Sequence, residues 1–136
     1  MRKQANVRQV LRLKHKVRVE MGDKWAEATP ADVFSVAASV EFAHPSIGYQ
    51  AFSYVEGKTE ARELLAARTF GFLKEVEALK KLGLAQGGSL ENAIVLDDTQ
   101  VLNPDGLRFS DEFARHKVLD AIGDLMLAGH RIFGRI

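Results

Sequence analysis

The fold is decided by residues 110–129, which read SDEFARHKVLDAIGDLMLAG. Ser110 can cap a helix, and Asp111 and Glu112 would lie in its first turn, where the helix dipole favours negative charge. Gly129 interrupts the pattern, so we predict a helix that runs to about residue 128. The apolar side chains expected to hold this helix against a core are Val118, Ile122, Leu125 and Met126.

Upstream of this helix, the sequence changes to the period-two pattern of strands with one buried face. Residues 11–20 and 36–42 alternate apolar with polar or small side chains, and residues 51–55 form a shorter strand. Residues 21–24 have the composition of a turn, so residues 25–29 are expected to return as a partner strand.

Two shorter helices are expected in the middle of the chain. Thr59 is the candidate cap of a helix that continues towards residue 68, and residues 73–82 form a second helical pattern that Gly83 ends. Residues 93–102 read as a hairpin around a polar turn. The remaining features are turns at residues 86–89 and 103–106 and a final strand at residues 130–136.

This order of elements favours one α+β domain spanning residues 1–136, with helices packed on one face of a mostly antiparallel sheet. We also expect a small βαβ-like insert at about residues 69–95. From the residues alone, its apolar side chains are favoured as ordinary core. The alternative is the wall of a passage for an acyl chain, because such sites are mostly apolar.

Composition excludes several classes of protein. The chain has 136 residues, 46% of them hydrophobic, which favours a folded core over disorder. It has no cysteine, so disulfides, thiolate metal sites and a cysteine nucleophile are excluded. Residues 1–10 have no apolar signal core, and no apolar run approaches the ~20 residues of a membrane span. We therefore expect a soluble, cytoplasmic protein without a membrane span.

Charge gives no general attraction to nucleic acid. Nineteen Lys and Arg balance eighteen Asp and Glu, for a net charge of +1. The basic side chains before Glu20 could form a nucleic-acid surface, but no aromatic RNA-binding motif accompanies them, and a solvated strand face is favoured. The basic residues concerned are Arg2, Lys3, Arg8, Arg12, Lys14, Lys16 and Arg18.

The densest group of chemically useful side chains lies on the last helix. His116 and Asp120 are four residues apart and therefore share one helix face, with Asp124 one turn further along. An imidazole and a carboxylate at this spacing can chelate one divalent ion, although catalytic zinc usually takes three protein ligands. On spacing alone, a surface salt bridge or hydrogen bond with a solvated Asp124 is the more common case.

The other histidines are weaker candidates. His15 lies in an otherwise apolar strand pattern, where a satisfied buried or edge histidine is the more common case. His44 lies in a loop, and His130 is expected at a strand edge.

Nearly the whole chain resembles the zinc-dependent UDP-3-O-acyl-N-acetylglucosamine deacetylases of lipid A biosynthesis, and the resemblance is most specific from Arg68 to Leu125. The motifs that carry it are VRVE (17–20), GDKWAE (22–27), EFAHP (41–45), ARTFGF (67–72), GGS (87–89), VLN (101–103), DGLRF (105–109) and DEFARHKVLDAIGDL (111–125).

The resemblance implies roles for particular residues. His116 and Asp120 match zinc ligands, Asp124 matches a carboxylate that supports a catalytic histidine, and Thr69 matches a position close to the metal. The positions that match substrate-binding residues are Lys24 and Phe42 near the UDP group, Phe70 near the sugar and acyl chain, Lys117 at the nucleotide end, and Gly88 and Ser89 in the insert.

The implied reaction is metal-assisted amide hydrolysis of a UDP-acyl-sugar, which releases acetate. In the family a first domain carries the third zinc ligand and the general base, and a catalytic histidine follows the last strand. Residues 1–136 match neither segment. We therefore expect weak zinc binding, little activity from this chain alone, and a tendency to self-associate. The alternative is a non-catalytic module that assembles with a complementary chain.

Overall fold

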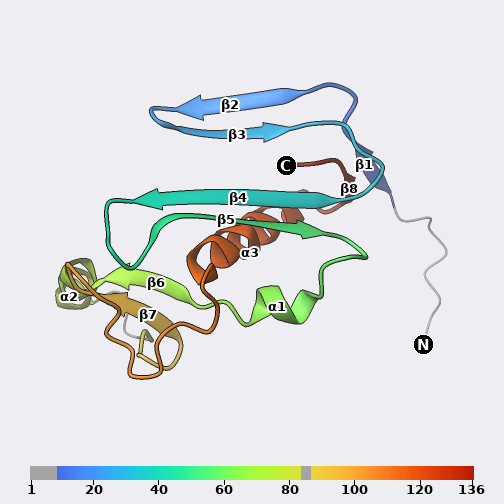
Figure 1. The fold of residues 1–136 in the computed structure, drawn as a ribbon. Coiled ribbons are helices and arrows are strands. Elements are labelled where there is room, and N and C mark those ends of the chain that lie inside the picture. The colour runs from blue at the N-terminus through green and yellow to red at the C-terminus, as the bar shows by residue number, and fades with distance from the viewer. Residues whose placement is uncertain (1–8, 84–86) are drawn as a thin grey trace.

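The structure is a computed structural model that describes residues 9–83 and 87–136. Within these ranges the chain forms three helices and eight strands, and the longest helix lies on one side of a largely antiparallel set of strands (Figure 1). The predicted α+β class is confirmed. Arg2, Lys3 and Arg8 of the basic segment, and Gln86 of the first predicted turn, lie outside the described residues.

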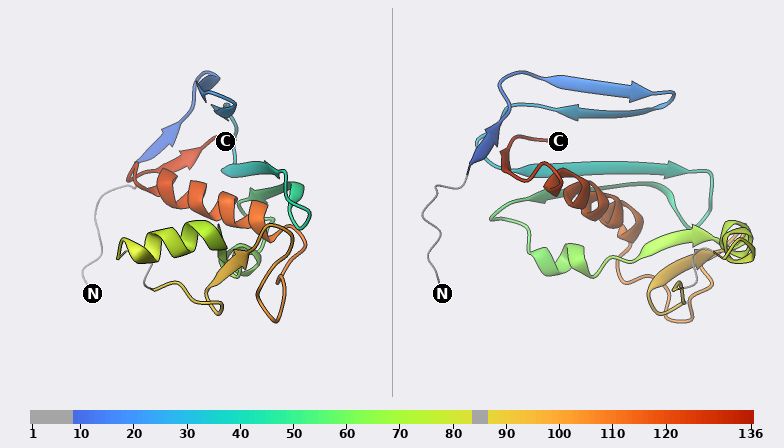
Figure 2. Two further views of the ribbon diagram at one scale, coloured as in Figure 1. Left: turned by 90° about the vertical axis from the view of Figure 1, so that its left-hand side faces the viewer. Right: turned by 180° about the vertical axis from the view of Figure 1, so that it is seen from behind.

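Two antiparallel hairpins form most of the strand structure. β2 (Val17–Met21) pairs with β3 (Lys24–Ala28), and β4 (Ser35–Phe42) pairs with β5 (Gly48–Val55). The β4–β5 hairpin is the centre of the fold, because α3 (Glu112–Met126) packs across one of its faces (Figure 2). β5 begins earlier than predicted from the sequence, since the ladder continues down to the tight turn at Gly48.

The predicted βαβ-like insert is present. β6 (Thr69–Phe72) leads directly into α2 (Leu73–Lys81), and β7 (Ala93–Leu96) returns parallel to β6. Gly83 follows α2 with a φ of 75°, a left-handed conformation that glycine adopts without steric cost. The insert therefore forms a small unit at one end of the β4–β5 hairpin (Figure 1).

One expected strand, residues 11–20, is two strands. β1 (Val10–Arg12) pairs in parallel with β8 (Arg131–Phe133), whereas β2 pairs with β3. Period-two alternation is the same in both strands, so it could not reveal that the chain changes partner between them. The prediction of a buried face was also wrong for β2, because all five of its side chains are exposed where the β2–β3 hairpin projects away from the helices (Figure 1).

The residues after β8 join the separate hairpins. Arg135 exchanges two backbone hydrogen bonds with Thr29, at 2.8 and 2.9 Å, and thereby reaches the end of β3. The N–H of Ser35, at the start of β4, donates to the carbonyl of Gly134 at 3.0 Å, and the N–H of Ile136 donates back to Ser35 at 2.9 Å. The expected final strand therefore holds the two hairpins in one body.

The core has two parts, and α3 contributes to both. The first lies between α3 and the β4–β5 hairpin, and the second lies beneath the insert. Of the helix residues predicted to face a core, Val118 is fully buried and Ile122 and Leu125 pack against the first part, but Met126 is half exposed because α3 ends there. The buried residues are Phe34, Val36, Leu64, Val118 and Ile132 in the first part and Ile47, Ile94, Leu96 and Phe113 in the second.

Both predicted helix caps are displaced by one residue. α1 (Ala61–Leu65) begins after Glu60, and the Thr59 hydroxyl instead accepts a hydrogen bond from the N–H of Val55 at 3.1 Å. α3 begins after Asp111 rather than Ser110. The Ser110 carbonyl accepts a hydrogen bond from the Gln50 side chain at 2.9 Å, and neither Glu60 nor Asp111 makes a side-chain capping hydrogen bond.

The turns at residues 97–99 and 103–106 form as expected. Asp97 accepts backbone hydrogen bonds from Thr99 and Gln100, both at 2.7 Å, and these bonds lower the pKa of its carboxyl group. The return strand of this hairpin is reduced to a single bridge between Leu96 and Val101, while the other edge of β7 pairs with β6. The N–H of Gly106 closes the second turn onto the Asn103 carbonyl at 2.9 Å.

The two-part core gives a test of stability. Phe113→Ala is expected to lower the free energy of unfolding by about 3–5 kcal/mol, because it removes a fully buried aromatic side chain. Leu127→Ala, at a position 86% exposed, is the matched control and should change the free energy by less than about 0.5 kcal/mol. Chemical denaturation measures both variants, and equal losses would contradict the assigned core.

Candidate functional site

The predicted pair on α3 forms. His116 Nε2 lies 3.2 Å from Asp120 Oδ1, with the imidazole 15% exposed and the carboxylate 43% exposed. Their i,i+4 spacing brings one nitrogen and one oxygen donor to the same point above the helix surface. The pair is accessible from solvent, but the opposite side of its helix is buried. A helix that is held in this way can position a site rigidly.

The other ring nitrogen of His116 is also in use. Nδ1 lies 3.2 Å from the carbonyl oxygen of Ala67, the residue that precedes Arg68 and β6. A carbonyl oxygen can only accept, so this contact requires a proton on Nδ1. Nε2 then faces Asp120 either with a second proton, as an imidazolium, or with a lone pair that a cation between nitrogen and carboxylate could use.

Beside this pair lies a buried ion pair that sequence reasoning did not identify. Arg68 Nε donates to Glu112 Oε1 at 3.0 Å, and Arg68 Nη2 donates to Glu112 Oε2 at 3.2 Å. The backbone N–H groups of Arg68 and Arg108 donate to the same carboxylate at 3.0 and 2.6 Å. Four donors therefore compensate a carboxylate that is fully removed from solvent.

The pKa of Glu112 reflects this balance. Burial raises the pKa, because it disfavours the charged carboxylate, but the hydrogen bonds from the Arg68 side chain, the Arg68 and Arg108 N–H groups and the positive charge of Arg68 outweigh it. The net result is a pKa below the usual 4.5. Glu112 is therefore ionised at neutral pH and carries a fixed negative charge one turn before His116.

Three of the expected site residues gather beside the pair: Lys117, Phe70 and Phe42. Lys117 Nζ donates to Asp120 Oδ2 at 3.1 Å and lies 5.5 Å from the centre of the Phe70 ring. Phe70 meets Phe42 edge-to-face with ring centres 5.8 Å apart, and its other contact is with buried Phe113 at 4.9 Å. The Lys117 ammonium group and the aromatic rings beside it therefore lie next to the Asp120 carboxylate. Thr69 follows Arg68 directly at the start of β6 and is exposed.

Other expected site residues lie elsewhere in the described part of the chain. Asp124 is exposed on α3, Lys24 lies at the tip of the β2–β3 hairpin, and Gly88 and Ser89 lie in the turn after α2, where Ser89 donates to the Asn92 side chain at 2.9 Å. None of these residues hydrogen-bonds to His116 or Asp120. Over residues 9–83 and 87–136, no group of three or more His, Asp or Glu side chains is placed to hold a metal ion.

The remaining histidines have other surroundings. His44 is buried, donates from Nε2 to the Asp97 carbonyl at 2.8 Å and accepts from the Ser46 N–H at 3.1 Å, so both nitrogens are satisfied by protein. His15 is exposed between β1 and β2 instead of lying on a buried face, since the expected single strand is broken there. His130 is exposed directly before β8, as expected of an edge.

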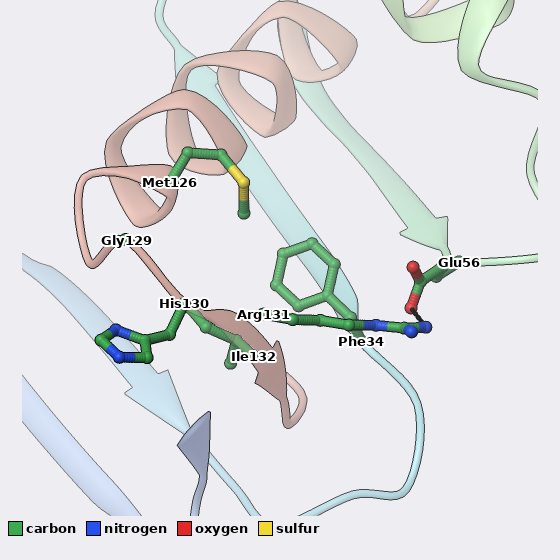
Figure 3. A pocket seen from close by; sticks show the side chains of 7 residues that line it. All are labelled: Phe34, Glu56, Met126, Gly129, His130, Arg131 and Ile132. Carbon is green, nitrogen blue, oxygen red and sulfur yellow. Dashed lines mark hydrogen bonds and ion pairs between the residues drawn. The ribbon is translucent and has the colours of Figure 1, made fainter. Parts of the chain in front are cut away.

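A hollow of about 450 Å³ lies at the other end of α3 (Figure 3). Met126 and Phe34 line it, and Arg131 bonds to Glu56 at 3.0 Å on its rim. Met126 is ten residues beyond His116, which corresponds to about 15 Å along the helix axis. This hollow is therefore separate from the His116–Asp120 pair.

Taken together, the fold and the pair define a class of protein: an α+β domain with a helix-borne histidine and aspartate that can contribute two ligands to a metal site. The whole chain, residues 1–136, matches the family described as LpxC: UDP-3-O-acyl N-acetylglycosamine deacetylase. The chain belongs to this family.

Curated relatives named UDP-3-O-acyl-N-acetylglucosamine deacetylase are similar over most of the chain. The protein of Pasteurella multocida is 54% identical over 91% of this chain and 42% of its own length. The protein of Nitratiruptor is 53% identical over 96% and 44%, and that of Myxococcus xanthus is 52% identical over 99% and 43%. The chain therefore spans less than half the length of these relatives.

None of the helices in the described residues combines the length and the apolar character that crossing a bilayer requires. The longest, α3, carries charged side chains along its exposed side and packs its apolar side on β4 and β5.

Removing the buried carboxylate should be costly. Glu112→Gln leaves the Arg68 guanidinium buried without a counter-charge, and we expect the free energy of unfolding to fall by about 3 kcal/mol. Glu63→Gln, which removes an exposed partner of Arg115, is the control and should cost less than about 1 kcal/mol. Thermal or urea unfolding at neutral pH distinguishes the two variants.

The lowered pKa of Glu112 also predicts an acid sensitivity. The stabilisation is complete above the usual carboxyl pKa of 4.5 and is lost as pH falls through the lower value of the folded state. The wild-type free energy of unfolding should therefore drop as the pH is lowered past 4.5, and the drop should be smaller in Glu112→Gln. Parallel pH profiles for the two proteins would argue that Glu112 titrates normally.

Proposed function

We propose that this chain is the part of a zinc-dependent deacetylase that contributes His116 and Asp120 as zinc ligands. The enzyme would act in the cytoplasm, removing acetate from UDP-3-O-acyl-N-acetylglucosamine in lipid A biosynthesis. The observation that carries the proposal is the approach of His116 Nε2 to Asp120 Oδ1 at 3.2 Å, with His116 Nδ1 held by a backbone carbonyl.

The donor set suits zinc. Neighbouring ligands of a tetrahedral zinc ion with bonds of about 2.1 Å lie about 3.4 Å apart, close to the present separation of Nε2 and Oδ1. Zinc-bound histidines usually donate their second N–H to a carbonyl or carboxylate, which is the position of Ala67 relative to His116. Since the described residues hold no third ligand near the pair, a further ligand would come from another part of the protein or from a partner chain.

When bound, zinc would polarise the acetamide carbonyl and activate a water molecule. Lys117 Nζ donates a hydrogen bond to the Asp120 carboxylate and helps to fix its orientation. The same ammonium group would also face a negatively charged part of the substrate. Thr69 would lie close to the reacting group, and Asp124 would orient a catalytic histidine supplied from outside these residues. Each of these roles rests on the family resemblance together with positions on α3 and β6.

The other proposed substrate contacts come from aromatic side chains, the β2–β3 hairpin and the insert. The ring contacts of Phe42 and Phe70 support a role for these side chains against the UDP-sugar and its acyl chain. Lys24 would reach the diphosphate from the β2–β3 hairpin, and Gly88 and Ser89 would line the passage beside the insert. The half-buried apolar side chains of β6 and α2 support an acyl-chain wall at this end of the fold.

Two alternatives have different support. A module completed by a complementary chain agrees with the coverage of less than half of each relative. A nucleic-acid surface on the basic segment has less support, because Lys16 pairs with Glu27 at 2.8 Å and Arg18 pairs with Glu20 at 2.6 Å. Basic side chains that are already paired with acids attract phosphate weakly.

Zinc titration against a chromophoric chelator tests the ligand assignment. The chain is expected to bind zinc weakly, and His116→Ala and Asp120→Asn should each lower the affinity about tenfold or more, because each removes one of two donors. Glu77→Gln, which changes an exposed carboxylate on α2, should leave the affinity unchanged. Equal affinity in all four proteins would refute the assigned ligands.

Acetate release from UDP-3-O-acyl-N-acetylglucosamine tests the division of the active site. This chain alone should show little turnover, and adding the complementary portion of a relative should restore it, because the base and a ligand would then be supplied. Robust turnover by the chain alone would show that residues 1–136 already contain a complete site.

Self-association stays a prediction. Leu65, at the end of α1, and Leu127, directly after α3, are 69% and 86% exposed, and Met126 is half exposed beside Leu127. Exposed apolar side chains of this size favour association. Sedimentation velocity of the wild-type chain and Leu127→Glu would measure it: a monomeric wild type at high concentration would contradict the prediction.

A further inference from the structure

The peptide group that joins Ala67 to Arg68 is hydrogen-bonded at both ends to the same helix. Its carbonyl oxygen lies 3.2 Å from His116 Nδ1, and its N–H donates to Glu112 Oε1 at 3.0 Å. Glu112 and His116 are four residues apart on α3, so they lie one turn apart on one face. A single peptide plane therefore connects the carboxylate of Glu112 to the imidazole of His116.

This connection has an electrostatic consequence. A carboxylate that accepts from a peptide N–H withdraws the proton and makes the carbonyl of the same peptide more negative, as in any chain of polarised hydrogen bonds. The effect is strongest away from water, and Glu112, Ala67 and Arg68 are 0%, 5% and 8% exposed. The Ala67 carbonyl is thus a stronger acceptor for His116 than an ordinary peptide carbonyl.

The side chain of Arg68 has a different task from its backbone N–H. The guanidinium neutralises Glu112 and continues to the Gly106 carbonyl at 2.9 Å, which ties the turn before α3 to the start of β6. The N–H alone lies on the path to His116. The structural and the electronic contribution of this residue can therefore be separated experimentally.

We propose that Glu112 is a positioning residue that selects the Nδ1–H tautomer of His116 through the Ala67–Arg68 peptide group. Asp120 faces the other nitrogen at 3.2 Å and competes for a proton there. The carboxylate behind the peptide shifts this competition towards Nδ1, which leaves the lone pair of Nε2 directed at Asp120 Oδ1 and available to a cation. The use of that lone pair for zinc rests on the proposed function, whereas the choice of tautomer does not.

The first measurement needs no metal. Nitrogen-15 NMR of His116 in the metal-free chain, at a pH high enough that the ring carries one proton, reports the share of each tautomer. In the wild type we expect mainly Nδ1–H. A wild-type ring that is mainly protonated on Nε2 would overturn the inference without the use of any variant.

Two variants test the path. Glu112→Gln keeps a group that can accept from the Arg68 N–H but removes the charge, and it should at least halve the population of the Nδ1–H tautomer relative to Nε2–H. Arg68→Lys keeps both the carboxylate and the backbone N–H, so its tautomer ratio should stay close to wild type although its melting temperature falls. An unchanged ratio in folded Glu112→Gln, or an equal shift in Arg68→Lys, would overturn the inference; circular dichroism verifies folding.

Zinc affinity separates this inference from the proposed function. If zinc binds through His116, Glu112→Gln should weaken binding about tenfold, the usual effect of losing a partner behind a metal ligand, and Arg68→Lys should weaken it less. Zinc binding that depends on His116 but not on Glu112 would refute the positioning role alone. A wild-type chain with the expected tautomers and no zinc binding would refute the proposed function and leave the control of the tautomer intact.

Discussion

The buried ion pair between Arg68 and Glu112 is the interaction on which the rest of the structure depends. It joins the segment between α1 and β6 to the first turn of α3, and its hydrogen bonds also reach the turn at Gly106 and the N–H of Arg108. A charge pair at this depth stabilises only while it is complete, because either partner alone would be a desolvated, uncompensated charge. The pair therefore sets the position of α3 relative to the insert more strictly than apolar contact could.

α3 is held from both sides of this pair. Phe113, next to Glu112, fills the core beneath the insert, and Val118 fills the core against the β4–β5 hairpin. His116 lies between these two buried positions and points to the remaining side, where Asp120, Lys117 and Phe70 gather. The candidate metal pair therefore lies between the two parts of the core. Rotation of α3 would expose buried apolar side chains in one of these parts.

Much of the candidate site was predictable from local patterns. The spacing of His116 and Asp120 required only the helical period, and the motif resemblance selected Phe42, Phe70 and Lys117, which the fold brings close to the pair. Glu112 was interpreted from the sequence only as an acid suited to the helix dipole. Its partner is 44 residues away in the sequence, and no local rule identifies which of the many basic side chains would be buried against it.

The sequence by itself determined the α+β class, the last helix to within two residues of its ends, the return of residues 25–29 as a partner strand and the histidine–aspartate spacing, because each follows from patterns over neighbouring residues. Tertiary structure alone decided that residues 11–20 divide between two partners, that Val17 and Val19 are exposed, and that the peptide after Ala67 lies between Glu112 and His116. These features depend on which distant segments meet. Which segments meet depends on burial and on the pairing of charges over the whole chain, so a local sequence pattern cannot predict it.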